Sequence, residues 1–509
     1  METWFILILS LFVAAILFHQ SHRKKLPPGP SVLASNFVIL TNSLPALEPF
    51  VRNFKLKYGS FITLFVGYHP SIFVSSHSLA HKVLVQQGAI FSDRPTSIPA
   101  RNISSASYGP TWRLLRRNLA TEILHPARVK SYSWARKWAL HILINQLREH
   151  KGSDGIKVVD HFHYAMFCLL VLMCFGDKLD EKTVNEIARV QRYSLFAAGS
   201  GRFDMLGLMP RLGKILFRNR WKELLQIRHD QEQVMIPLIK SRIEAVNSGR
   251  NLLGDKKIVA YVDTLVNLKL PEEEADNGNG GKLTDKEIVS MCDEFLNAGT
   301  DTTSTALQWI MANLMKYPRI QSKLFDEIVS VVGPPPRGED ETAINEEDLH
   351  KMPYLKAVVL EGLRRHPPGH FVLPHRVMKE VYLEGYMIPQ GATINFMVAD
   401  MGWDPKVWDD PMEFKPERFL VNGDRNCVFD ISGSKGIKMM PFGAGRRVCP
   451  GSELAILQLE YYVANLIWYF HWTSPDGYEV DLSEKPEFTI VMKHPLRAHV
   501  SSRTEKLII

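Results

Sequence analysis

The sequence predicts a mainly α-helical fold with a small β portion, preceded by an N-terminal membrane anchor helix. An apolar run with helical periodicity extends from about Ile288 to Met315, which is far too long for a strand. Between Val381 and Ile394 the pattern changes to short strand-like pieces, interrupted by Gly385 and by the turn Pro389-Gln390-Gly391. At the amino terminus, fifteen uncharged and strongly apolar residues run from Trp4 to Phe18.

This N-terminal run is the first element in chain order. As a helix it would be about 22 Å long, slightly shorter than a hydrocarbon core unless its flanks contribute. A cleavable signal peptide is an alternative, but the positive charge of Arg23-Lys24-Lys25 follows the apolar run, and no Ala-x-Ala site precedes the bulk of the protein. We therefore expect residues 1–25 to form a signal-anchor transmembrane helix with a cytosolic basic flank.

The segment Leu26-Pro27-Pro28-Gly29-Pro30 predicts a stiff hinge over residues 26–30, because prolines preset extended backbone. The whole chain of 509 residues is 45% hydrophobic, which is ample for a large core within residues 31–509. Length alone suggests about three domains. The motifs described below would have to meet at one site, so we predict a single domain.

Charge and cysteine content restrict the partners. A net charge of +7 without a concentrated basic tract gives no indication of nucleic-acid binding, although a positive face could receive an acidic electron donor. The five cysteines include no Cys-x-x-Cys pair, which favours a reducing compartment.

The long apolar helix has a well-marked start and an unusual polar centre. Thr284 and Glu287 form a Thr-x-x-Glu capping box. Within Ala298-Gly299-Thr300-Asp301-Thr302-Thr303, Gly299 would let a flat ligand approach the backbone. Thr302 can bond to the carbonyl of Ala298 or to a water or dioxygen, and Asp301 beside it suits proton delivery. The alternative is that these residues form the polar side of an amphipathic helix.

The segment from Phe442 to Gly451 carries the strongest signal, with the spacing Phe-x-x-Gly-x-Arg-x-Cys-x-Gly. Phe442 can pack on a flat macrocycle, the two glycines Gly443 and Gly445 avoid a collision with it, and Arg447 can pair with a haem propionate. Cys449 precedes an expected helix start, whose positive end would depress the thiol pKa and favour a thiolate that promotes O–O cleavage. A phosphate loop is an alternative, but Val448 occupies the place of a third glycine; an ordinary buried cysteine is another.

On these residues the chain resembles the cytochrome P450 haem-thiolate monooxygenases. Within that family it is similar to the plant microsomal branch, and to a subgroup with members that oxidise fatty acids or linear chlorophyll catabolites. The resemblance implies the cytochrome P450 fold, haem b with Cys449 as the axial ligand of its iron, and electrons from NADPH through a separate reductase. It also implies residence in the endoplasmic reticulum membrane, with the catalytic domain in the cytosol.

The resemblance also implies roles for further residues. Its acid and alcohol pair corresponds to Asp301 and Thr302. The propionate partners correspond to Trp112 and Arg116, within Trp112-Arg113-Leu114-Leu115-Arg116, and to Arg376; a basic exposed helix face is the alternative for Arg116. An internal charged network that stabilises the haem loop corresponds to Glu361, Arg364 and Arg418, although a lone Glu-x-x-Arg is usually a weak surface pair.

The resemblance further implies that the loop from Ala100 to Tyr108 and the stretch His370-Phe371-Val372-Leu373 face the pocket above the haem. Both segments are mostly apolar or small. A hydrophobic substrate is therefore expected. Arg101 is a candidate partner for a substrate carboxylate, with plain surface exposure as the alternative. Three functions are compatible with the sequence: an NADPH-dependent monooxygenase, a reductase-independent haem isomerase or dehydratase, and a non-catalytic haem-binding protein. The pair Asp301 and Thr302 favours the first.

Overall fold

The structure is a computed structural model of the chain. It describes residues 26–41, 47–95, 101–149, 155–199, 203, 210–249, 258–271, 281–336, 342–420 and 429–503. Helices make up 57% of the structure and strands 11%, which confirms the mainly α prediction. The predicted anchor, residues 1–25, lies outside the described residues.

In chain order the helices, including short π and 3₁₀ turns marked η, are α2 (Val32–Thr41), α3 (Glu48–Tyr58), α4 (His77–His81), η3 (Lys82–Gln86), α5 (Pro110–Asn118), η4 (Leu119–Ile123), α6 (Pro126–Ser131), α7 (Ser133–Glu149), α8 (Val158–Phe175), α9 (Glu181–Gly199), α11 (Pro210–Leu216), α12 (Arg218–Asn247), α13 (Tyr261–Val266), α14 (Asp285–Lys316), α15 (Pro318–Val332), η6 (Glu346–Lys351), α16 (Pro353–Arg365), α17 (Val398–Gly402), η7 (Pro416–Phe419), η8 (Gly445–Arg447) and α18 (Ser452–Tyr469).

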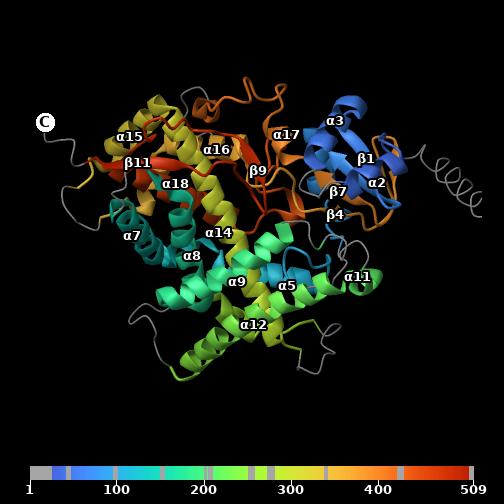
Figure 1. Cartoon of the computed structure of the whole chain (residues 1–509), viewed down its shortest axis with the longest axis horizontal. Coiled ribbons are helices and arrows are strands. Elements are labelled where there is room, and N and C mark those ends of the chain that lie inside the picture. Colours follow the sequence, from blue (N-terminus) through green and yellow to red (C-terminus); the bar gives the residue numbers. More distant parts are fainter. Residues whose placement is uncertain are drawn as a thin grey trace, which may run out of the picture.

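The principal sheet joins distant parts of the chain. Its strand order is β1-β2-β7-β4, and β2 pairs with β7 in parallel, with Ile72 opposite Ile394. The other sheets are β10-β9, β3-β11-β8 and the hairpin β5-β6. The strands are β1 (Phe61–Val66), β2 (His69–Val74), β3 (Ile156–Lys157), β4 (His375–Arg376), β5 (Val381–Leu383), β6 (Tyr386–Ile388), β7 (Thr393–Phe396), β8 (Phe470–Thr473), β9 (Glu484–Pro486), β10 (Ile490–Met492) and β11 (Arg497–Ser502). The short strands predicted between 381 and 394 are thereby confirmed. In Figure 1, strands β1, β4 and β7 lie at the right with helices α2 and α3, whereas β11 lies at the left among the helices and β9 lies near the middle.

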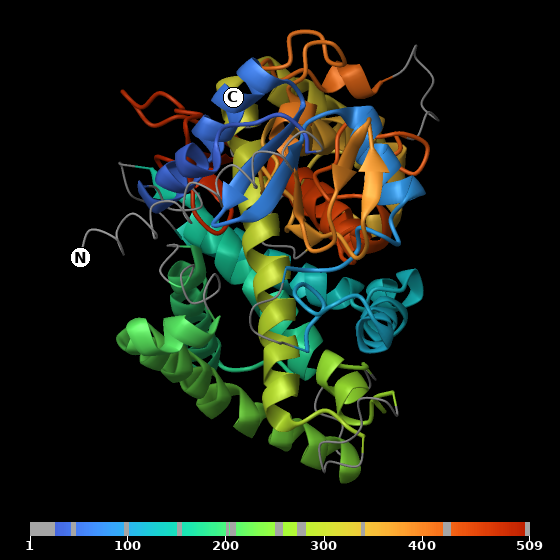
Figure 2. The same ribbon diagram turned by 90° about the vertical axis from the view of Figure 1, so that its right-hand side faces the viewer.

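Helix α14 is the central element, and its start agrees with the prediction. The Thr284 side chain accepts from the Glu287 backbone N–H at 3.3 Å, and the Glu287 carboxylate accepts from the Thr284 N–H at 2.8 Å. The helix runs through the molecule between α8, α16 and α18 (Figure 2). Most of its residues from Thr303 to Met315 are buried, because neighbours cover it on every side.

Helix α8 is the apolar partner of α14. In the part of the chain that the structure describes, it is the one helix long and apolar enough to cross a membrane, and 78% of that stretch is buried inside the protein. Its apolar residues Phe167 to Phe175 belong to the hydrophobic core between α8, α12 and α14.

The proline segment is docked on the principal sheet. The Thr63 N–H of β1 donates to the Pro28 carbonyl at 3.0 Å. A Cβ on Gly29 would lie 1.8 Å from the Thr63 carbonyl oxygen, so glycine permits this close contact. Pro28 and Gly29 of the predicted hinge are therefore packed against the domain.

Candidate active site

Cys449 lies in a short closed loop between η8 and α18. Its backbone N–H donates to the Phe442 carbonyl at 2.8 Å, and the Val448 N–H donates to the Gly445 carbonyl at 3.1 Å. Three residues later α18 begins at Ser452. The loop therefore presents one sulfur in a fixed position, while the partly buried Phe442 ring packs against the core around α14 and α18.

The expected depression of the thiol pKa is wrong in its net direction. Burial raises the pKa of Cys449, while the Gly451 backbone N–H and the Arg116 guanidinium lower it by less. The predicted helix end does contribute, but desolvation of the sulfur outweighs it. A cation bound at the sulfur would have to supply the remaining stabilisation of the thiolate, as metal ions do when they coordinate thiols.

The two loop glycines serve the protein backbone. Both adopt positive φ, +69° for Gly443 and +72° for Gly445. A Cβ on Gly445 would lie 1.9 Å from the Leu84 carbonyl oxygen of η3, so this glycine lets two backbone segments meet. The prediction that Gly445 provides clearance for a macrocycle missed this contact. At Gly443 the nearest atom to a Cβ would be the Val372 side chain at 3.6 Å, an ordinary contact.

Three guanidiniums lie around the loop: Arg94, Arg116 and Arg447. Arg116 donates to the Val448 carbonyl, directly before the cysteine. The remaining acceptors are also backbone carbonyls, at 2.7–3.1 Å: those of Ser104, Leu373 and Pro374 for Arg94, and those of Ser92, Ile103 and Ala106 for Arg447. Within the described ranges, none of the three forms a salt bridge. We call these three residues the arginine cluster.

The arginine cluster carries charge that burial makes costly. Burial lowers the pKa of Arg94 to about 9 and that of Arg447 to about 10, and repulsion between positive groups adds to both shifts. Burial also lowers the pKa of Arg116. The carboxylates of Asp93 and Glu294 oppose the shifts at Arg94 and Arg447. A bound dianion would offset this charge, and haem carries two propionates, so the cluster fits haem.

The loop from 101 to 108 connects the arginine cluster to α14. The buried Glu294 carboxylate of α14 accepts from the backbone N–H groups of Ile103 at 2.8 Å and Ser104 at 2.6 Å. The Ile103 carbonyl in turn accepts from the Trp112 indole at 3.0 Å and from Arg447 at 3.1 Å. The Arg447 guanidinium also lies 4.3 Å from the centroid of the Trp112 ring. Trp112 therefore holds Arg447 by stacking, while its N–H is bonded to the loop.

Arg376 is misplaced for its predicted role. Its side chain is exposed and reaches toward Gly391, whereas the preceding residue, His375, is buried. The His375 ring lies 2.6 Å from the Phe91 carbonyl, and its pKa is lowered to about 3 by burial, with Arg94 and Arg447 adding to the shift. His375 is thus the member of this pair that faces the arginine cluster. The physical reason is the alternation of side chains along β4.

Asp301 and Thr302 lie together on α14 but contact different groups. The Thr302 hydroxyl donates to the Ala298 carbonyl at 2.7 Å, as predicted. The Asp301 Oδ1 atom lies 3.6 Å from Nε2 of His163 on α8. A Cβ on Gly299 would lie 2.7 Å from Leu170 of α8, so this glycine permits close packing of the two helices, where the sequence had suggested room for a flat ligand.

Glu361, Arg364 and Arg418 meet in the interior. Glu361 and Arg364 are fully buried and form a bidentate pair at 2.7 and 2.8 Å, and Arg418 reaches Glu361 at 3.0 Å. The two arginines also donate to backbone carbonyls between 402 and 413, and Glu361 accepts from the Lys415 backbone N–H at 2.8 Å. Arg364 also lies over the Trp408 ring, whose indole donates to the Lys438 carbonyl at 3.4 Å. The network therefore fastens segment 402–415 directly, and Trp408 links it to Lys438, a few residues before the cysteine loop.

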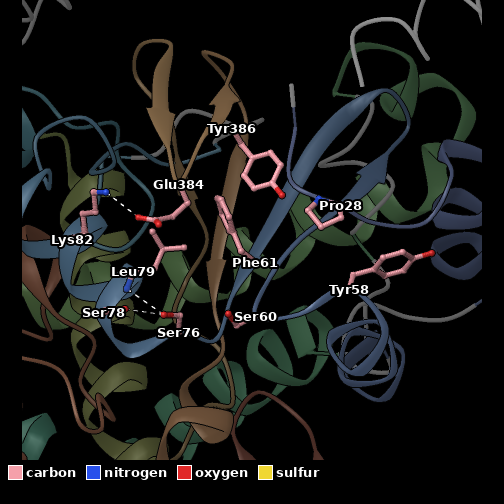
Figure 3. A pocket seen from close by; sticks show the side chains of 10 residues that line it. All are labelled: Pro28, Tyr58, Ser60, Phe61, Ser76, Ser78, Leu79, Lys82, Glu384 and Tyr386. Atoms are coloured by element: carbon pink, nitrogen blue, oxygen red, sulfur yellow. Dashed lines mark hydrogen bonds and ion pairs between the residues drawn. The ribbon is translucent and has the colours of Figure 1, made fainter. Parts of the chain in front are cut away.

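A separate cavity of about 360 Å³ lies between the docked proline segment, strands β1 and β2, and the β5-β6 hairpin (Figure 3). Lys82 and Glu384 form an ion pair at its rim, with 2.9 Å between Nζ and Oε1. None of the predicted site residues lines it, so it is distinct from the cysteine loop. Its lining residues are Pro28, Tyr58, Ser60, Phe61, Ser76, Ser78, Leu79, Lys82, Glu384 and Tyr386.

Comparisons with known proteins agree with this geometry. The family model described as Cytochrome P450 matches residues 27–501. Cytochrome P450 89A9 of Arabidopsis thaliana is 47% identical over 98% of this chain and 97% of its own length. The beta-amyrin 24-hydroxylase of Glycine max and the flavonoid 3'-monooxygenase of Arabidopsis thaliana are each 28% identical, over 97% and 98% of this chain and 95% and 97% of their own lengths.

A solved structure shows the same fold. A zebra fish cytochrome P450 with progesterone superimposes with a TM-score of 0.72 at 24% identity, covering 90% of this chain and 100% of that chain. The match extends across nearly the whole chain and includes the cysteine loop and the arginine cluster. The chain belongs to the cytochrome P450 family, the haem-dependent monooxygenases, and is similar to its plant members.

Proposed function

We propose that this protein is an NADPH- and O₂-dependent monooxygenase that hydroxylates or epoxidises a hydrophobic small molecule, with electrons from a separate reductase. The observation that carries the proposal is the position of Cys449 in a closed loop beside the arginine cluster. This arrangement fits haem b, because a sulfur can bind its iron while guanidiniums take its propionates.

We assign the axial ligand to Cys449 and propionate binding to Arg116 and Arg447. In place of Arg376 we assign the third propionate contact to His375, because it is the buried residue of that pair. Trp112 supports Arg447 by stacking on it. Arg94 holds the surrounding backbone at 104, 373 and 374.

Haem supplies the activation of dioxygen when it is bound. The part of the protein is to handle protons and exclude water. The Thr302 hydroxyl holds its proton toward the Ala298 carbonyl and can release that bond to a new acceptor. The Asp301 carboxylate, on the next residue, can take up and release a proton. Both groups belong to one rigid helix, which keeps their separation constant.

A hydrophobic substrate is supported by the apolar character of residues 370–373 and of the 101–108 loop. The related enzymes named as beta-amyrin, isoflavone and flavonoid hydroxylases carry names of largely apolar plant compounds. Fatty acids and linear tetrapyrroles remain our candidate classes. Arg101 pairs with Glu287 at 3.1 Å, so we do not assign it to a substrate carboxylate.

We further propose residence at the endoplasmic reticulum membrane with the described domain in the cytosol. Apolar side chains are exposed next to the docked proline segment: Leu33 and Phe37 on α2 are 66% and 69% exposed, and Tyr68 in the β1–β2 turn is 66% exposed. Asn36 ties α2 to this turn through two hydrogen bonds with Gly67, at 2.6 and 2.8 Å. These residues therefore form one apolar surface close to where an anchor would begin.

The deciding experiment is the reduced carbon monoxide difference spectrum of the expressed protein, of Cys449→Ala and of Cys168→Ala. Cys168 is a buried free cysteine of α8 and serves as the matched control. We expect the red-shifted thiolate band in the native protein and in Cys168→Ala, and its loss in Cys449→Ala. A folded native protein that takes up haem without that band would refute the assignment. Product formation without a reductase would favour an isomerase instead.

A further inference from the structure

A narrow crevice lies beside Asp301, on the face of α14 that meets α8 and α9. It is lined by residues of all three helices, namely His163, Phe167, Ala188, Gln191, Arg192, Leu195, Asn297, Thr300 and Asp301. At its centre the Nε2 atom of His163 lies 3.6 Å from Oδ1 of Asp301. The two side chains therefore face each other across a helix interface, and no described residue of the cysteine loop takes part.

The imidazole ring of His163 is held in one orientation by stacking, which suits proton transfer in one direction. Its ring stacks on Phe167, one turn further along α8, with centroids 5.9 Å apart and planes inclined by 19°. The side chain keeps 12% of its surface exposed, and that of Asp301 keeps 26%. The imidazole is thus partly open to solvent, while its Nε2 atom faces the carboxylate.

The crevice itself has no volume for a water molecule. In a crevice this narrow, a side chain can carry a proton from solvent to Asp301. Imidazole is the side-chain group suited to this near neutral pH, because it can accept a proton at one nitrogen and release one. Along α14 adjacent positions are turned by about 100°, so Asp301 can face the crevice while Thr302 points elsewhere.

Building on the proposed monooxygenase function, we propose that His163 is a positioning residue that supplies Asp301 with protons from solvent. In the step, the N–H bond at Nε2 of the imidazolium breaks and an O–H bond forms at Oδ1 of Asp301. The neutral imidazole then regains a proton from solvent at the surface between α8 and α9. No electrons move in this step, and the separation of 3.6 Å closes by a small rotation of either side chain.

The charged groups around His163 come from each helix packed against it. Asp301 faces it from α14, and Arg192 faces it from α9. Asp160 of α8 pairs with Arg192 at 3.8 Å and with Lys157 at 3.0 Å, at the exposed mouth of the crevice. Asp301 and Arg192 thus place charges of opposite sign beside the His163 ring.

The test uses the full-length holoenzyme with its reductase, and compares the native protein with His163→Gln, Asp301→Asn and the double variant. His161→Gln is the matched control, because His161 lies on the same helix and its ring contacts Gln146 at 3.0 Å. NADPH consumption and peroxide formation are measured across pH, in H₂O and D₂O, without substrate and with lauric acid as the probe. The carbon monoxide spectrum confirms equal haem loading.

We expect His163→Gln to slow NADPH consumption about tenfold, less than the roughly 10²–10⁴-fold contributed by a group that transfers the proton directly, because His163 acts through Asp301. It should also raise the solvent isotope effect and flatten the pH profile, while His161→Gln stays within twofold of the native enzyme. The double variant should be no slower than Asp301→Asn, since both changes break one path. Equal rates and pH profiles in the two histidine variants would overturn the inference and leave the proposed function intact. A native holoenzyme that consumes no NADPH would remove both.

Discussion

The hydroxyl of Thr302 is a group of the candidate site whose proposed role can be tested directly. Its single bond in the described chain, to the Ala298 carbonyl, spans one turn of α14 and constrains that turn. A bond of this type competes weakly with helix hydrogen bonding, so it can open without unwinding the helix. The hydroxyl is therefore available to a new acceptor at low cost.

Replacing Thr302 with alanine should leave haem uptake unchanged and divert reducing equivalents to peroxide. We expect the fraction of consumed NADPH recovered as product to fall about tenfold or more, because proton delivery at a positioned group contributes that much. The measurement is NADPH consumption beside peroxide and product yield. Thr302→Ser keeps the hydroxyl and should retain most of the coupling. Undiminished coupling in Thr302→Ala would show that the hydroxyl has no such role.

At this scale the motifs of the sequence lead to several residues that the structure brings together around Cys449, but not to all of them. Cys449, Arg447 and Arg116 could be found because their spacing is distinctive. Arg376 was chosen over His375 by residue type, although the alternation of β4 decides which of two neighbours faces inward, and its register depends on pairing with β7. Arg94 was missed because its acceptors lie at 104, 373 and 374, far away in sequence.

Among the secondary structure elements, the junction of η3 with η8 is the tightest backbone contact of the cysteine loop. Gly445 combines a positive φ of +72° with an approach to the Leu84 carbonyl that leaves no room for a Cβ. Gly477 has a similar φ of +73° but open space around it. Alanine at Gly477 would therefore bear only the conformational cost of a positive φ, whereas alanine at Gly445 would also bear the steric cost of the contact with Leu84.

Gly477→Ala should lower the free energy of unfolding by about 1–2 kcal/mol, the cost of the left-handed conformation. Gly445→Ala should lower it by about 2–3 kcal/mol more, because the loop or η3 must also move. Urea unfolding and haem content per folded protein measure both effects. We expect haem loss only in Gly445→Ala. Equal effects of the two substitutions would show that the contact with Leu84 is easily relieved.

Short-range sequence signals predicted the helices and strands, but they could not predict contacts between residues that are far apart in sequence. The capping box at Thr284 and the breaks at Gly385 and Gly391 act within a few residues, so α14 and strands β5 to β7 could be predicted. The docking of Pro28 on β1 and of Gly445 on η3 depends on partners that only the folded chain brings together. A glycine in a sequence indicates that another group approaches its backbone closely, but the sequence does not show which residue supplies that group.

Across the whole molecule, a buried histidine makes stability depend on pH. His366 stacks on Trp309, with centroids 4.0 Å apart, and its Nδ1 atom lies 3.1 Å from Glu484. Burial lowers its pKa to about 4, although Glu484 acts in the opposite direction. The unfolded chain binds this proton near pH 6.5, so the contribution to stability is present above that pH and is lost as the pH falls toward 4.

Lowering the pH from 7 to 5 should therefore reduce the free energy of unfolding by roughly 2 kcal/mol more in the native protein than in His366→Gln. Asp293 and Glu460, whose pKa values burial raises to about 7, titrate with the opposite sign. They are present in both proteins and cancel in the difference. Urea midpoints at the two pH values give the measurement. His494→Gln, at an exposed site, is the control and should match the native protein; a matching result for His366→Gln would contradict the account.

The hydrogen bonds that hold the 101–108 loop can form only late in biosynthesis. The Ile103 carbonyl accepts from the Arg447 guanidinium, and Arg447 is synthesised 344 residues after Ile103. At ribosomal speed that interval is roughly 20–70 s. Over this time the nascent chain carries an unfinished loop whose N–H groups also lack Glu294 until α14 emerges. The 101–108 loop is thus among the last regions to mature, and a polypeptide truncated before residue 447 cannot complete it.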